Sequence, residues 1–460
     1  MSYTSVVDLL PQPQRLLLSE VIGSFSYALD MAEGVTPGHS LRCCWLGMKI
    51  AKSLSLNAEE LWDLYYILLL KDIGGTSISS KLTVLFANDE KIIKNGLKIL
   101  NTDNFFDNIQ FILSNTSVNS GFVTRFAKML PLFLNGKYYR NELLRSRSER
   151  GADLVIQLGF NDNVADGIHC LNEHWDGNGH ADGIKDNVIP VNSQIALIAE
   201  VFEVYYQKFD FEKALNELKI RSSRWFNPDI IKLTIKFLSE TKNRNTWESF
   251  KSESVLKEHV YALESDKNNV TIDDERLDDI ATAFAQIVDS KSPYTNGHST
   301  RVALYSDAIA NELGLSVGRR RWLYRGALLH DLGNMGLSNL IIDKQDALSK
   351  DEIVEKKLHS RNTFELLRHM QSFKELAKVA SGHHESLDGA GYPKGISESR
   401  ISLETRIITV ADIFDTLLTG NSHSKSKALA TVLLVMDKQC DSILDRDCFN
   451  ALKKRIPDFF

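Results

Sequence analysis

Histidine and aspartate side chains that could bind a metal gather in the second half of the chain. His330 and Asp331 are adjacent and follow Ala327-Leu328-Leu329, an apolar run typical of a buried helix. One ion can reach both side chains, and such nitrogen and oxygen ligands suit manganese, iron, cobalt or nickel better than a thiolate-type zinc site. The candidate metal ligands are His298, His330, Asp331, His359, His383, His384 and Asp412. Seven ligands indicate two ions, because one small cation seldom uses more than about six.

A pair of such ions is suited to phosphodiester hydrolysis. Two cations about 3.5–4 Å apart lower the pKa of a bridging water and hold both the attacking and the leaving oxygen of an in-line displacement. The reaction needs no side-chain nucleophile. Histidines outside the cluster are interpreted as surface or hydrogen-bonded residues, and these are His259, His369 and His423.

The elements that must position these ligands are predicted to be helices. The chain has only nine prolines in 460 residues, and its Leu, Ala, Glu and Lys residues recur with helical period. Alternating strand patterns are rare, so the fold class is expected to be all-α. The most apolar stretch, 61–70, contains Asp63 and is about half as long as the ~20 residues of a membrane span. We interpret it as a core helix and expect no membrane partner.

Charge and cysteine usage narrow the function classes. The chain has 54 Lys and Arg against 60 Asp and Glu, a net charge of −6, which argues against duplex nucleic acid or an anionic membrane as the main partner. The five cysteines form no CxxC pair or regular framework. No signal peptide is visible, so we expect a cytoplasmic protein.

Two segments repeat at a constant offset. Gly-His-Ser-x-Arg occurs at 38–42 and again at 297–301, which is an offset of 298 − 39 = 259 residues. The same offset places Lys71-Asp72 on His330-Asp331. Two matches at one offset indicate a duplicated domain, and the period is far too long for a stacked repeat array.

A second offset applies further along the chain. The segment 176–184 corresponds to 388–396, an offset of 388 − 176 = 212, and this offset also pairs Glu200 with Asp412. The difference, 259 − 212 = 47, predicts an insertion in the first copy between Asp72 and about Arg147. Because 241–275 is polar and charged, we predict domains at 1–240 and 276–460, joined by a helical and polar linker at 241–275.

The first copy has lost most of the candidate ligands. It keeps His39, whereas the positions of His330, His359, His383, His384 and Asp412 are taken by Lys71, Arg147, Leu171, Asn172 and Glu200. A lysine ammonium repels a cation, so the first domain is predicted to be degenerate and non-catalytic. An alternative is a separate metal site made by His169, His174 and His180 near Asp176, although their spacing matches no common site.

The motifs of the second copy occur in an order that resembles a known family. They are Gly297-His298-Ser299-Thr300-Arg301, His330-Asp331-x-Gly333, Leu358-His359, His383-His384-Glu385, Asp388-Gly389-x-Gly391-Tyr392-Pro393 and Val410 to Asp415. This pattern, over about residues 275–455, resembles the HD-GYP subgroup of the HD phosphohydrolases. The resemblance implies a helical enzyme that uses iron or manganese and hydrolyses cyclic dinucleotides.

The resemblance also implies roles for single residues. One metal would be held by His298, His330, Asp331 and Asp412, and Asp331 would bridge to a second metal held by His359, His383 and His384. Nickel and cobalt are the alternatives to manganese and iron. The candidate catalytic residues are His330, Asp331 and Asn334, and the candidate substrate-binding residues are Arg301, Asp388, Gly391, Tyr392, Pro393 and Lys425.

Three positions differ from the pattern of the family. Asn334 stands where the family has a lysine, Tyr294 where some members place a third-metal glutamate, and Asn421 where an arginine is common, while Lys425 remains. The tandem arrangement and the lost basic residues resemble bacterial enzymes that degrade 3′,3′-cGAMP. We therefore favour 3′,3′-cGAMP as the substrate over cyclic di-GMP, with a linear 5′-phosphorylated dinucleotide as the product.

Two alternatives of other classes remain at this point. One is a weakly active or inactive cyclic-dinucleotide receptor or adaptor, which the missing lysine at Asn334 would explain. The other is a nucleotidase acting on mononucleotides, against which the Gly-Tyr-Pro loop argues. We further expect the first domain to pack on the second, and we leave a homodimer open.

Overall fold

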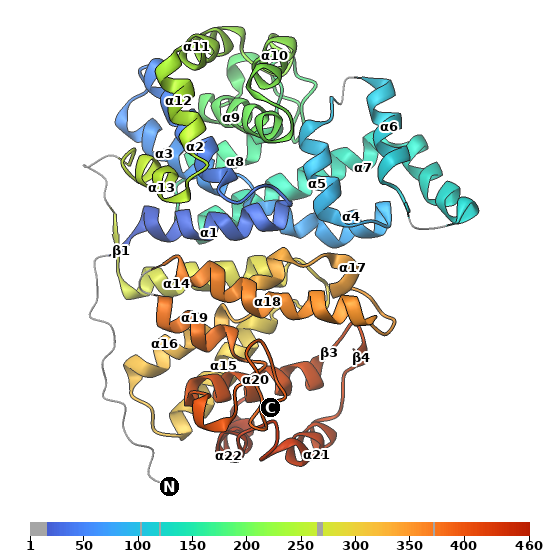
Figure 1. Cartoon of the computed structure of the whole chain (residues 1–460), viewed down its shortest axis with the longest axis vertical. Coiled ribbons are helices and arrows are strands. Elements are labelled where there is room, and N and C mark those ends of the chain that lie inside the picture. Colours follow the sequence, from blue (N-terminus) through green and yellow to red (C-terminus); the bar gives the residue numbers. More distant parts are fainter. Residues whose placement is uncertain (1–15, 102–103, 119–120, 265–269, 371–372) are drawn as a thin grey trace. The chain divides into compact units, whose positions relative to one another are not determined.

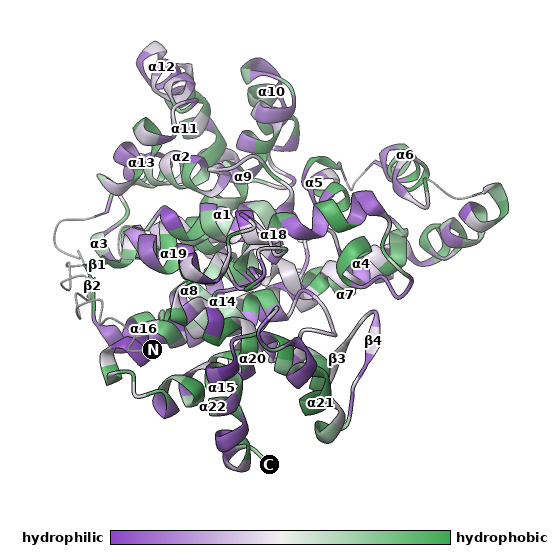
Figure 2. Ribbon diagram, turned by 60° about the horizontal axis from the view of Figure 1, so that its bottom comes forward, coloured by the Kyte–Doolittle hydropathy of each residue, from purple (hydrophilic) through white to green (hydrophobic). Residues whose placement is uncertain are grey.

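The computed structural model of the chain describes residues 16–101, 104–118, 121–264, 270–370 and 373–460. Within these ranges the chain is almost entirely helical, which confirms the all-α prediction (Figure 1). The strands are two residues long each, and they are β1 (Leu16–Leu17), β2 (Thr271–Ile272), β3 (Gly420–Asn421) and β4 (Ser424–Lys425). Purple and green residues alternate along most helices in Figure 2, as expected for helices with one buried face.

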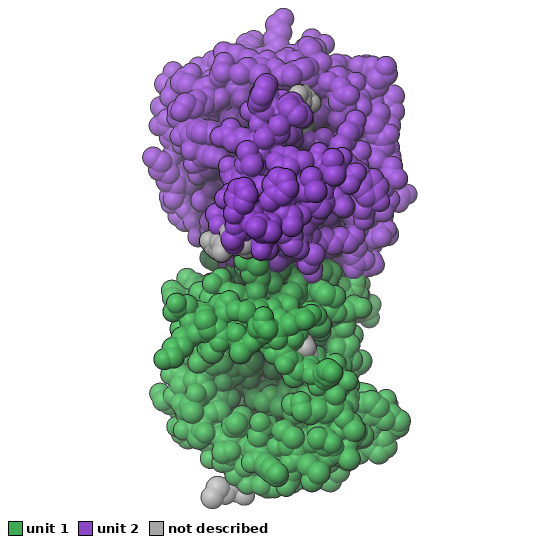
Figure 3. All heavy atoms as spheres, turned by 90° about the vertical axis from the view of Figure 1, so that its right-hand side faces the viewer, with its two compact units in different colours: residues 1–16, 271–460 green, residues 17–270 purple. Residues whose placement is uncertain are grey.

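The chain divides into two compact units, which are coloured separately in Figure 3. The N-terminal unit comprises residues 17–270, and the C-terminal unit comprises 271–460 together with Leu16. No helix in the part of the chain that the structure describes combines the length and the hydropathy needed to cross a membrane.

The polar stretch that the sequence suggested as a linker contains two packed helices. These are α12 (Thr241–Ser249) and α13 (Glu253–Tyr261), and both belong to the N-terminal unit. Trp247, Phe250, Leu256 and Val260 are buried, and the Trp247 ring lies 6.0 Å from that of Trp45. The boundary between the units therefore falls at 270/271, after these helices. Residues 265–269 of the expected linker lie outside the described residues, as do residues 1–15.

The C-terminal unit is built around α15 and α18. Its helices are α14 (Asp274–Asp289), α15 (His298–Glu312), α16 (Val317–Leu328), η5 (Leu332–Gly336), α17 (Asn339–Ile342), α18 (Lys350–Arg368), α19 (Lys374–Ser381), η7 (Glu398–Arg400), α20 (Leu403–Thr419), α21 (Leu429–Gln439), α22 (Arg446–Arg455) and η8 (Ile456–Asp458). Helix α15 packs against α16, α20 and α22, and α18 packs against α19 and η5.

Side-chain caps fix where the helices that carry the site begin. Ser349 and Glu352 form a capping box at the start of α18, and Ser402 caps α20 by accepting from the backbone N–H of Thr405. Helix α15 begins after Gly297, whose φ of 69° lies in the left-handed region that glycine adopts at little cost. The first residue of α15 is consequently His298.

The N-terminal unit repeats this packing. Its helices are α1 (Leu18–Glu33), α2 (His39–Ser53), α3 (Ala58–Leu70), η1 (Ile73–Ile78), α4 (Ser79–Phe86), α5 (Glu90–Ile99), α6 (Phe105–Asn115), α7 (Phe122–Gln157), α8 (Asp162–His169), η2 (Cys170–Asn172), η3 (Asp186–Val188), α9 (Val191–Lys208), α10 (Phe211–Arg221), α11 (Pro228–Ser239), α12 and α13. Helix α2 packs against α3 and α9, and α7 packs against η1 and α8, as their counterparts do in the C-terminal unit.

Two side-chain contacts recur as well. Asp289 accepts hydrogen bonds from the backbone N–H and the hydroxyl of Ser299, at 3.0 and 2.7 Å. Asp30 makes the same two bonds with Ser40, at 3.1 and 2.6 Å. In each unit a buried carboxylate thus anchors the first turn of the helix that begins with a histidine.

Candidate metal centre

The seven candidate ligands of the C-terminal unit come from five elements and lie together. His298 begins α15, His330 and Asp331 lie in the turn between α16 and η5, and His359 lies in α18. His383 and His384 follow the end of α19, and Asp412 lies in α20. Two groups whose ligand atoms all fall within 4.8 Å of one another are His298, His330 and Asp412, and His359, His383 and His384.

A glycine allows the turn that carries His330 and Asp331 to reach α18. A Cβ atom on Gly333 would lie only 1.9 Å from the carbonyl oxygen of His359, so any other residue would separate the two segments. The contact is closed by Thr363, whose hydroxyl donates to the carbonyl of His330 at 2.9 Å and accepts from the N–H of Gly333 at 2.9 Å. This packing holds Asp331 next to His359.

The carboxylate of Asp331 lies between two sets of imidazoles. Its Oδ2 is 3.9 Å from Nε2 of His298 and 3.7 Å from Nε2 of His330. Its Oδ1 is 3.6 Å from Nε2 of His359 and 3.7 Å from Nε2 of His383. One oxygen therefore faces each group, which is the arrangement that a carboxylate bridging two ions requires.

The imidazoles are oriented with their Nε2 atoms toward the centre. The Nδ1 atoms of His330, His359 and His383 lie 2.7, 2.6 and 2.6 Å from the carbonyl oxygens of residues 327, 356 and 380. A carbonyl only accepts, so each Nδ1 carries the proton and each Nε2 carries a lone pair.

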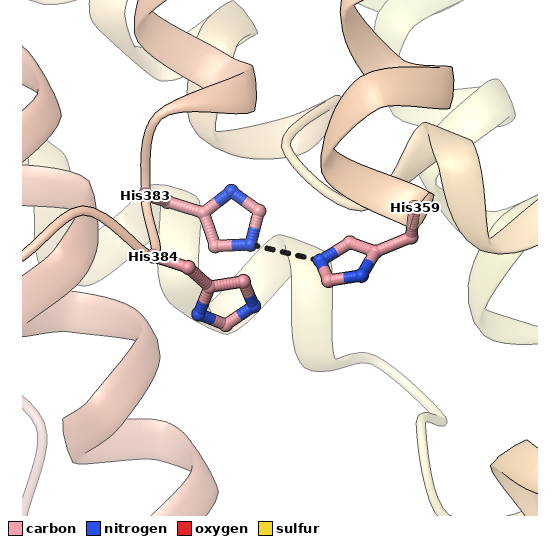
Figure 4. A group of neighbouring side chains, drawn as sticks. All are labelled: His359, His383 and His384. Atoms are coloured by element: carbon pink, nitrogen blue, oxygen red, sulfur yellow. Dashed lines mark hydrogen bonds between the residues drawn. The ribbon is translucent and has the colours of Figure 1, made fainter. Parts of the chain in front are cut away.

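Those lone pairs have few ordinary donors, and the one near His359 is the hydroxyl of Ser360, 3.4 Å from its Nε2. Nε2 of His359 faces Nε2 of His383 at 3.4 Å, as Figure 4 shows with the rings turned toward each other. The buried Nε2 of His330 has no hydrogen-bond partner within the described ranges. Converging acceptors with so few donors fit bound cations, and a hydrogen bond from the far ring nitrogen is the usual support of a metal-ligating histidine.

The electrostatics around Asp331, His383 and His384 favour the protonation states that a metal needs. Burial by itself would raise the pKa of Asp331, but the surrounding histidines hold it below its usual range. Burial lowers the pKa of His383 to about 4, and it also lowers that of His384. The carboxylate is therefore ionised and these two imidazoles are neutral at neutral pH.

His298 is supported by a carboxylate that the sequence did not single out. Its Nδ1 lies 2.8 Å from Oδ2 of Asp415, and Arg301 contacts the same carboxylate with Nε at 2.7 Å and Nη2 at 3.0 Å. Burial opposes the charged form of His298, yet its contacts with Asp412 and Asp415 raise its pKa well above the usual value. Asp415 lies three residues after Asp412 and so on the same face of α20, which is the spacing that could have identified it.

Tyr392 is a predicted substrate residue whose ring packs beside one of the candidate ligands. Its ring centroid is 4.7 Å from that of His384, and the ammonium of Lys357 lies 4.9 Å from the Tyr392 ring. Gly391 is needed for this loop, because a Cβ atom there would lie 2.4 Å from the backbone nitrogen of Ser386. Lys357, on the exposed side of α18, is a cation near the centre that the motifs did not indicate.

The other predicted substrate and catalytic residues differ in their exposure and in their contacts. Arg301 is engaged by Asp415, as described above, and the Tyr392–Pro393 peptide bond is cis. Asp388 is exposed and accepts from the backbone N–H of Ala390 at 2.9 Å, so it holds the loop. Lys425 is exposed in β4, and Asn334 is half-buried in η5, three residues from Asp331.

In the N-terminal unit, cations occupy the equivalent position. Lys71 contacts the carboxylate of Asp72 and lies 3.1 Å from Glu200, and Lys98 lies 2.6 Å from Asp72 and also contacts Glu200. The guanidinium of Arg147 also contacts the carboxylate of Asp72. His39, Asp72 and Glu200 do lie within metal-binding distance of one another, but these cations already engage both carboxylates.

The alternative histidine site of this unit is not assembled. His169 pairs with Asp182 at 2.9 Å, whereas His174 stacks on Trp225 with ring centroids 4.1 Å apart. The rings of His174 and His180 are 6.3 Å apart. Within the described residues, these three histidines form no group with metal-binding spacing.

Comparisons with known proteins agree with this geometry. The family model described as the HD domain matches residues 76–230 and again 282–448. The chain is 40% identical over 439 residues to a 3′3′-cGAMP-specific phosphodiesterase 3 of Vibrio cholerae, covering 95% of this chain and 94% of that relative. It is 32% identical over 181 residues to the cyclic di-GMP phosphodiesterase response regulator RpfG of Xanthomonas campestris, covering 39% of this chain and 48% of the relative.

A solved structure extends the agreement to the fold. The crystal structure of a cyclic GMP-AMP-specific phosphodiesterase of V. cholerae matches with a TM-score of 0.66 at 36% identity, over 96% of this chain and 98% of that one. The chain therefore belongs to the HD-domain family of phosphohydrolases, and its ordered His-Asp and Gly-Tyr-Pro motifs place it in the HD-GYP subgroup.

Proposed function

We propose that the chain is a metal-dependent phosphodiesterase that hydrolyses a cyclic dinucleotide, with 3′,3′-cGAMP as its substrate. One 3′–5′ linkage is opened, and a linear 5′-phosphorylated dinucleotide is released. The observation that carries the proposal is the position of Asp331, whose two carboxylate oxygens face separate groups of imidazoles.

In this proposal, the seven candidate ligands are divided between two ions. His298, His330, Asp331 and Asp412 hold the first, and His359, His383 and His384 hold the second together with Asp331. HD-domain phosphohydrolases are metal-dependent, and this nitrogen and oxygen ligand set favours manganese or iron, with nickel and cobalt as alternatives. When bound, the two ions supply an activated water and neutralise the charge of the phosphodiester.

The side chains around the ligands complete the site. Asp415 keeps His298 in the tautomer and orientation that present Nε2, and Asp331 stays ionised. Tyr392 presents an aromatic face beside His384, on which a nucleobase or ribose can lie. Lys357, close to that ring, offers a positive charge to a phosphate where Asn334 provides none.

The choice of substrate is supported by the extent of the similarity. The relative named for 3′3′-cGAMP matches 95% of the chain, whereas the cyclic di-GMP relative RpfG matches 39% of it. Cyclic di-GMP is the alternative substrate. In this proposal residues 271–460 carry the reaction and residues 17–270 are non-catalytic, while packing between the two and a homodimer stay predictions.

A turnover assay tests the proposal. Purified full-length protein with Mn²⁺ is expected to convert 3′,3′-cGAMP faster than cyclic di-GMP, measured by chromatography of the products. Asp331→Ala is expected to lose both activity and bound metal. Asp307→Ala, which removes a surface partner of Arg320, should retain both. If two ions bind per chain and neither dinucleotide is hydrolysed, the chain is a receptor instead.

A further inference from the structure

A cavity of about 530 Å³ lies within the N-terminal unit. Its walls come from η1, α4 and α5, from the inserted helices α6 and α7, and from α9. It also reaches Arg147 and Glu200, which occupy the positions of His359 and Asp412 of the metal centre. No role in the proposed hydrolysis depends on this cavity.

One end of the cavity is apolar, with both aliphatic and aromatic side chains. Its floor is a buried core of Ile78, Leu82, Phe86, Ile93 and Leu132. Further hydrophobic side chains that are only partly buried pack against this core and line the cavity, and they are Leu85, Leu97, Phe111, Ile112, Tyr139 and Leu143. A cyclic dinucleotide would leave its riboses and phosphates without partners here, whereas an alkyl chain would find contacts on every side.

The other end is positively charged. Lys71, Lys94, Lys98 and Arg147 surround the carboxylates of Glu33, Asp72 and Glu200, so four cations face three anions with a net charge of 4 − 3 = +1. The cations keep the pKa of Glu33, Asp72 and Glu200 below the usual range although burial alone would raise it. Lys98 and Arg147 belong to both this cluster and the cavity wall.

Two more cations line the cavity beside this cluster. They are Lys137 and Arg140, one turn apart on α7. Helix α7 contains seven Lys and Arg residues against three acidic residues, Glu142, Glu149 and Asp153. The net positive charge of this helix favours an anion at this end.

His174 gives an independent indication of a polar ligand. It lines the cavity, is 4% exposed, and its Nδ1 has no hydrogen-bond partner among the residues described. Burial lowers its pKa to about 3, so the ring is neutral at neutral pH and offers Nδ1 as a donor or an acceptor. A buried polar atom of this kind is costly unless something bonds to it.

We propose that the N-terminal unit binds an amphipathic organic anion, namely a single-chain acyl carboxylate of medium length. The alkyl chain lies among the aliphatic side chains around Leu97 and Leu143. The carboxylate lies at the charged end, within reach of Lys137, Arg140 and His174. The duplicated domain has thus exchanged a metal centre for an ion-pair cluster and an acyl-anion site.

Calorimetric titration of the full-length protein with decanoate, below the concentration at which it forms micelles, tests this proposal. Decanoate is expected to bind with one site per chain. Octanoate, which is two methylenes shorter, is expected to bind about 15-fold more weakly, because each buried methylene contributes about fourfold in affinity. Decanol and acetate, which lack the charge or the chain, are expected to bind at least about tenfold more weakly than decanoate.

Variants separate the cavity from other surfaces. Lys137→Met and Arg140→Met should each weaken decanoate binding by about tenfold, whereas Lys128→Met, an exposed lysine of the same helix outside the cavity wall, should not. Leu143→Trp should fill the cavity and abolish binding. Equal affinity in Leu143→Trp and the unchanged protein, or equal affinity for decanol and decanoate, overturns the proposal. Binding of anionic phospholipid vesicles that Leu143→Trp leaves unchanged also overturns it, because the ligand would then be a membrane surface.

Discussion

Single atoms of Asp331 and of the neighbouring histidines have distinct positions in the candidate metal centre. The two oxygens of Asp331 face different imidazoles, and the Nδ1 protons of three histidines are fixed by backbone carbonyls. The seven candidate ligands could be named from the sequence because each belongs to a recognisable motif, and the structure brings them together. Asp415 closes the Val410 to Asp415 motif, but its role was not assigned from the sequence, because that role depends on where α20 meets α15.

Replacing Asp415 should weaken metal binding without removing a ligand. In Asp415→Asn, Arg301 loses an ionic partner and His298 loses the charge that holds its ring in place. We expect Mn²⁺ affinity to fall by about 10- to 100-fold, as for other residues that orient metal ligands. Competition titration with a fluorescent chelator measures the change, with Asp307→Asn as the surface control. Unchanged affinity would show that Asp415 contributes only to packing.

His174 predicts a pH dependence of stability in the N-terminal unit. Its pKa falls from 6.5 in the unfolded chain to about 3 in the folded protein, chiefly through burial. The unfolded state therefore binds the additional proton between these values, and stability is full above pH 6.5 and declines as the pH falls toward 3. The slope is about 1.4 kcal/mol per pH unit.

Comparison with a variant isolates this contribution. His174→Phe keeps a ring against Trp225 but cannot take up a proton. From pH 7 to about pH 5, the free energy of unfolding of the unchanged protein should drop by about 2 kcal/mol more than that of the variant. Urea unfolding followed by tryptophan fluorescence gives both values. Parallel pH profiles would mean that His174 titrates normally in the folded state.

At the scale of elements, the site depends on how closely η5 approaches α18. Gly333 makes this approach possible, and Gly74 does the same for η1 and α7, where a Cβ atom would lie 2.1 Å from the carbonyl oxygen of Arg147. In the sequence, Gly74 and Gly333 each stand two residues after the repeated aspartate, Asp72 or Asp331. The reason for these glycines was not visible in the sequence, because it lies in the contact of η5 with α18 and of η1 with α7, and these helices come later in the chain.

Gly333→Ala should therefore destabilise the C-terminal unit by about 3 kcal/mol or more, since backbone atoms and not flexible side chains would have to move. It should also lower metal content, because Asp331 and His359 are separated. Gly136→Ala is the control: a Cβ there meets nothing within 4 Å, and the change should be neutral or slightly stabilising. Chemical unfolding and metal analysis of both variants measure the effects, and equal stability would refute the argument.

Element boundaries were the part of the fold that the sequence predicted least well. Helices α12 and α13 have polar exposed faces, and composition averaged over such a stretch resembles a linker. Their few apolar residues are nevertheless buried in the N-terminal unit, among them Trp247 and Val260. A short amphipathic helix is recognised from the positions of its apolar residues. The average polarity of the segment does not show these positions.

At the scale of the whole molecule, the two units share one helical arrangement but balance the charge of their buried carboxylates in two different ways. In the C-terminal unit, converging carboxylates and imidazoles face one another with few donors and fit bound cations. In the N-terminal unit, lysine and arginine side chains supply the positive charge from within the chain. Removing all of these cations would leave the buried carboxylates uncompensated, at a cost of about 3–5 kcal/mol for each broken pair. The cluster is therefore expected to be required for folding of that unit.

Metal binding should consequently protect only one unit. A ligand that binds the native state reduces local opening around its site, so Mn²⁺ should slow amide hydrogen exchange in η5, α18 and α20. The corresponding segments η1, α7 and α9 should exchange at the same rate with and without Mn²⁺, because Lys71, Lys98 and Arg147 already neutralise their carboxylates. Hydrogen exchange followed by mass spectrometry of peptides resolves the two sets, and Asp331→Ala should abolish the effect of Mn²⁺. Protection that appears in α9 as well would show that His39, Asp72 and Glu200 bind an ion despite the cations beside them.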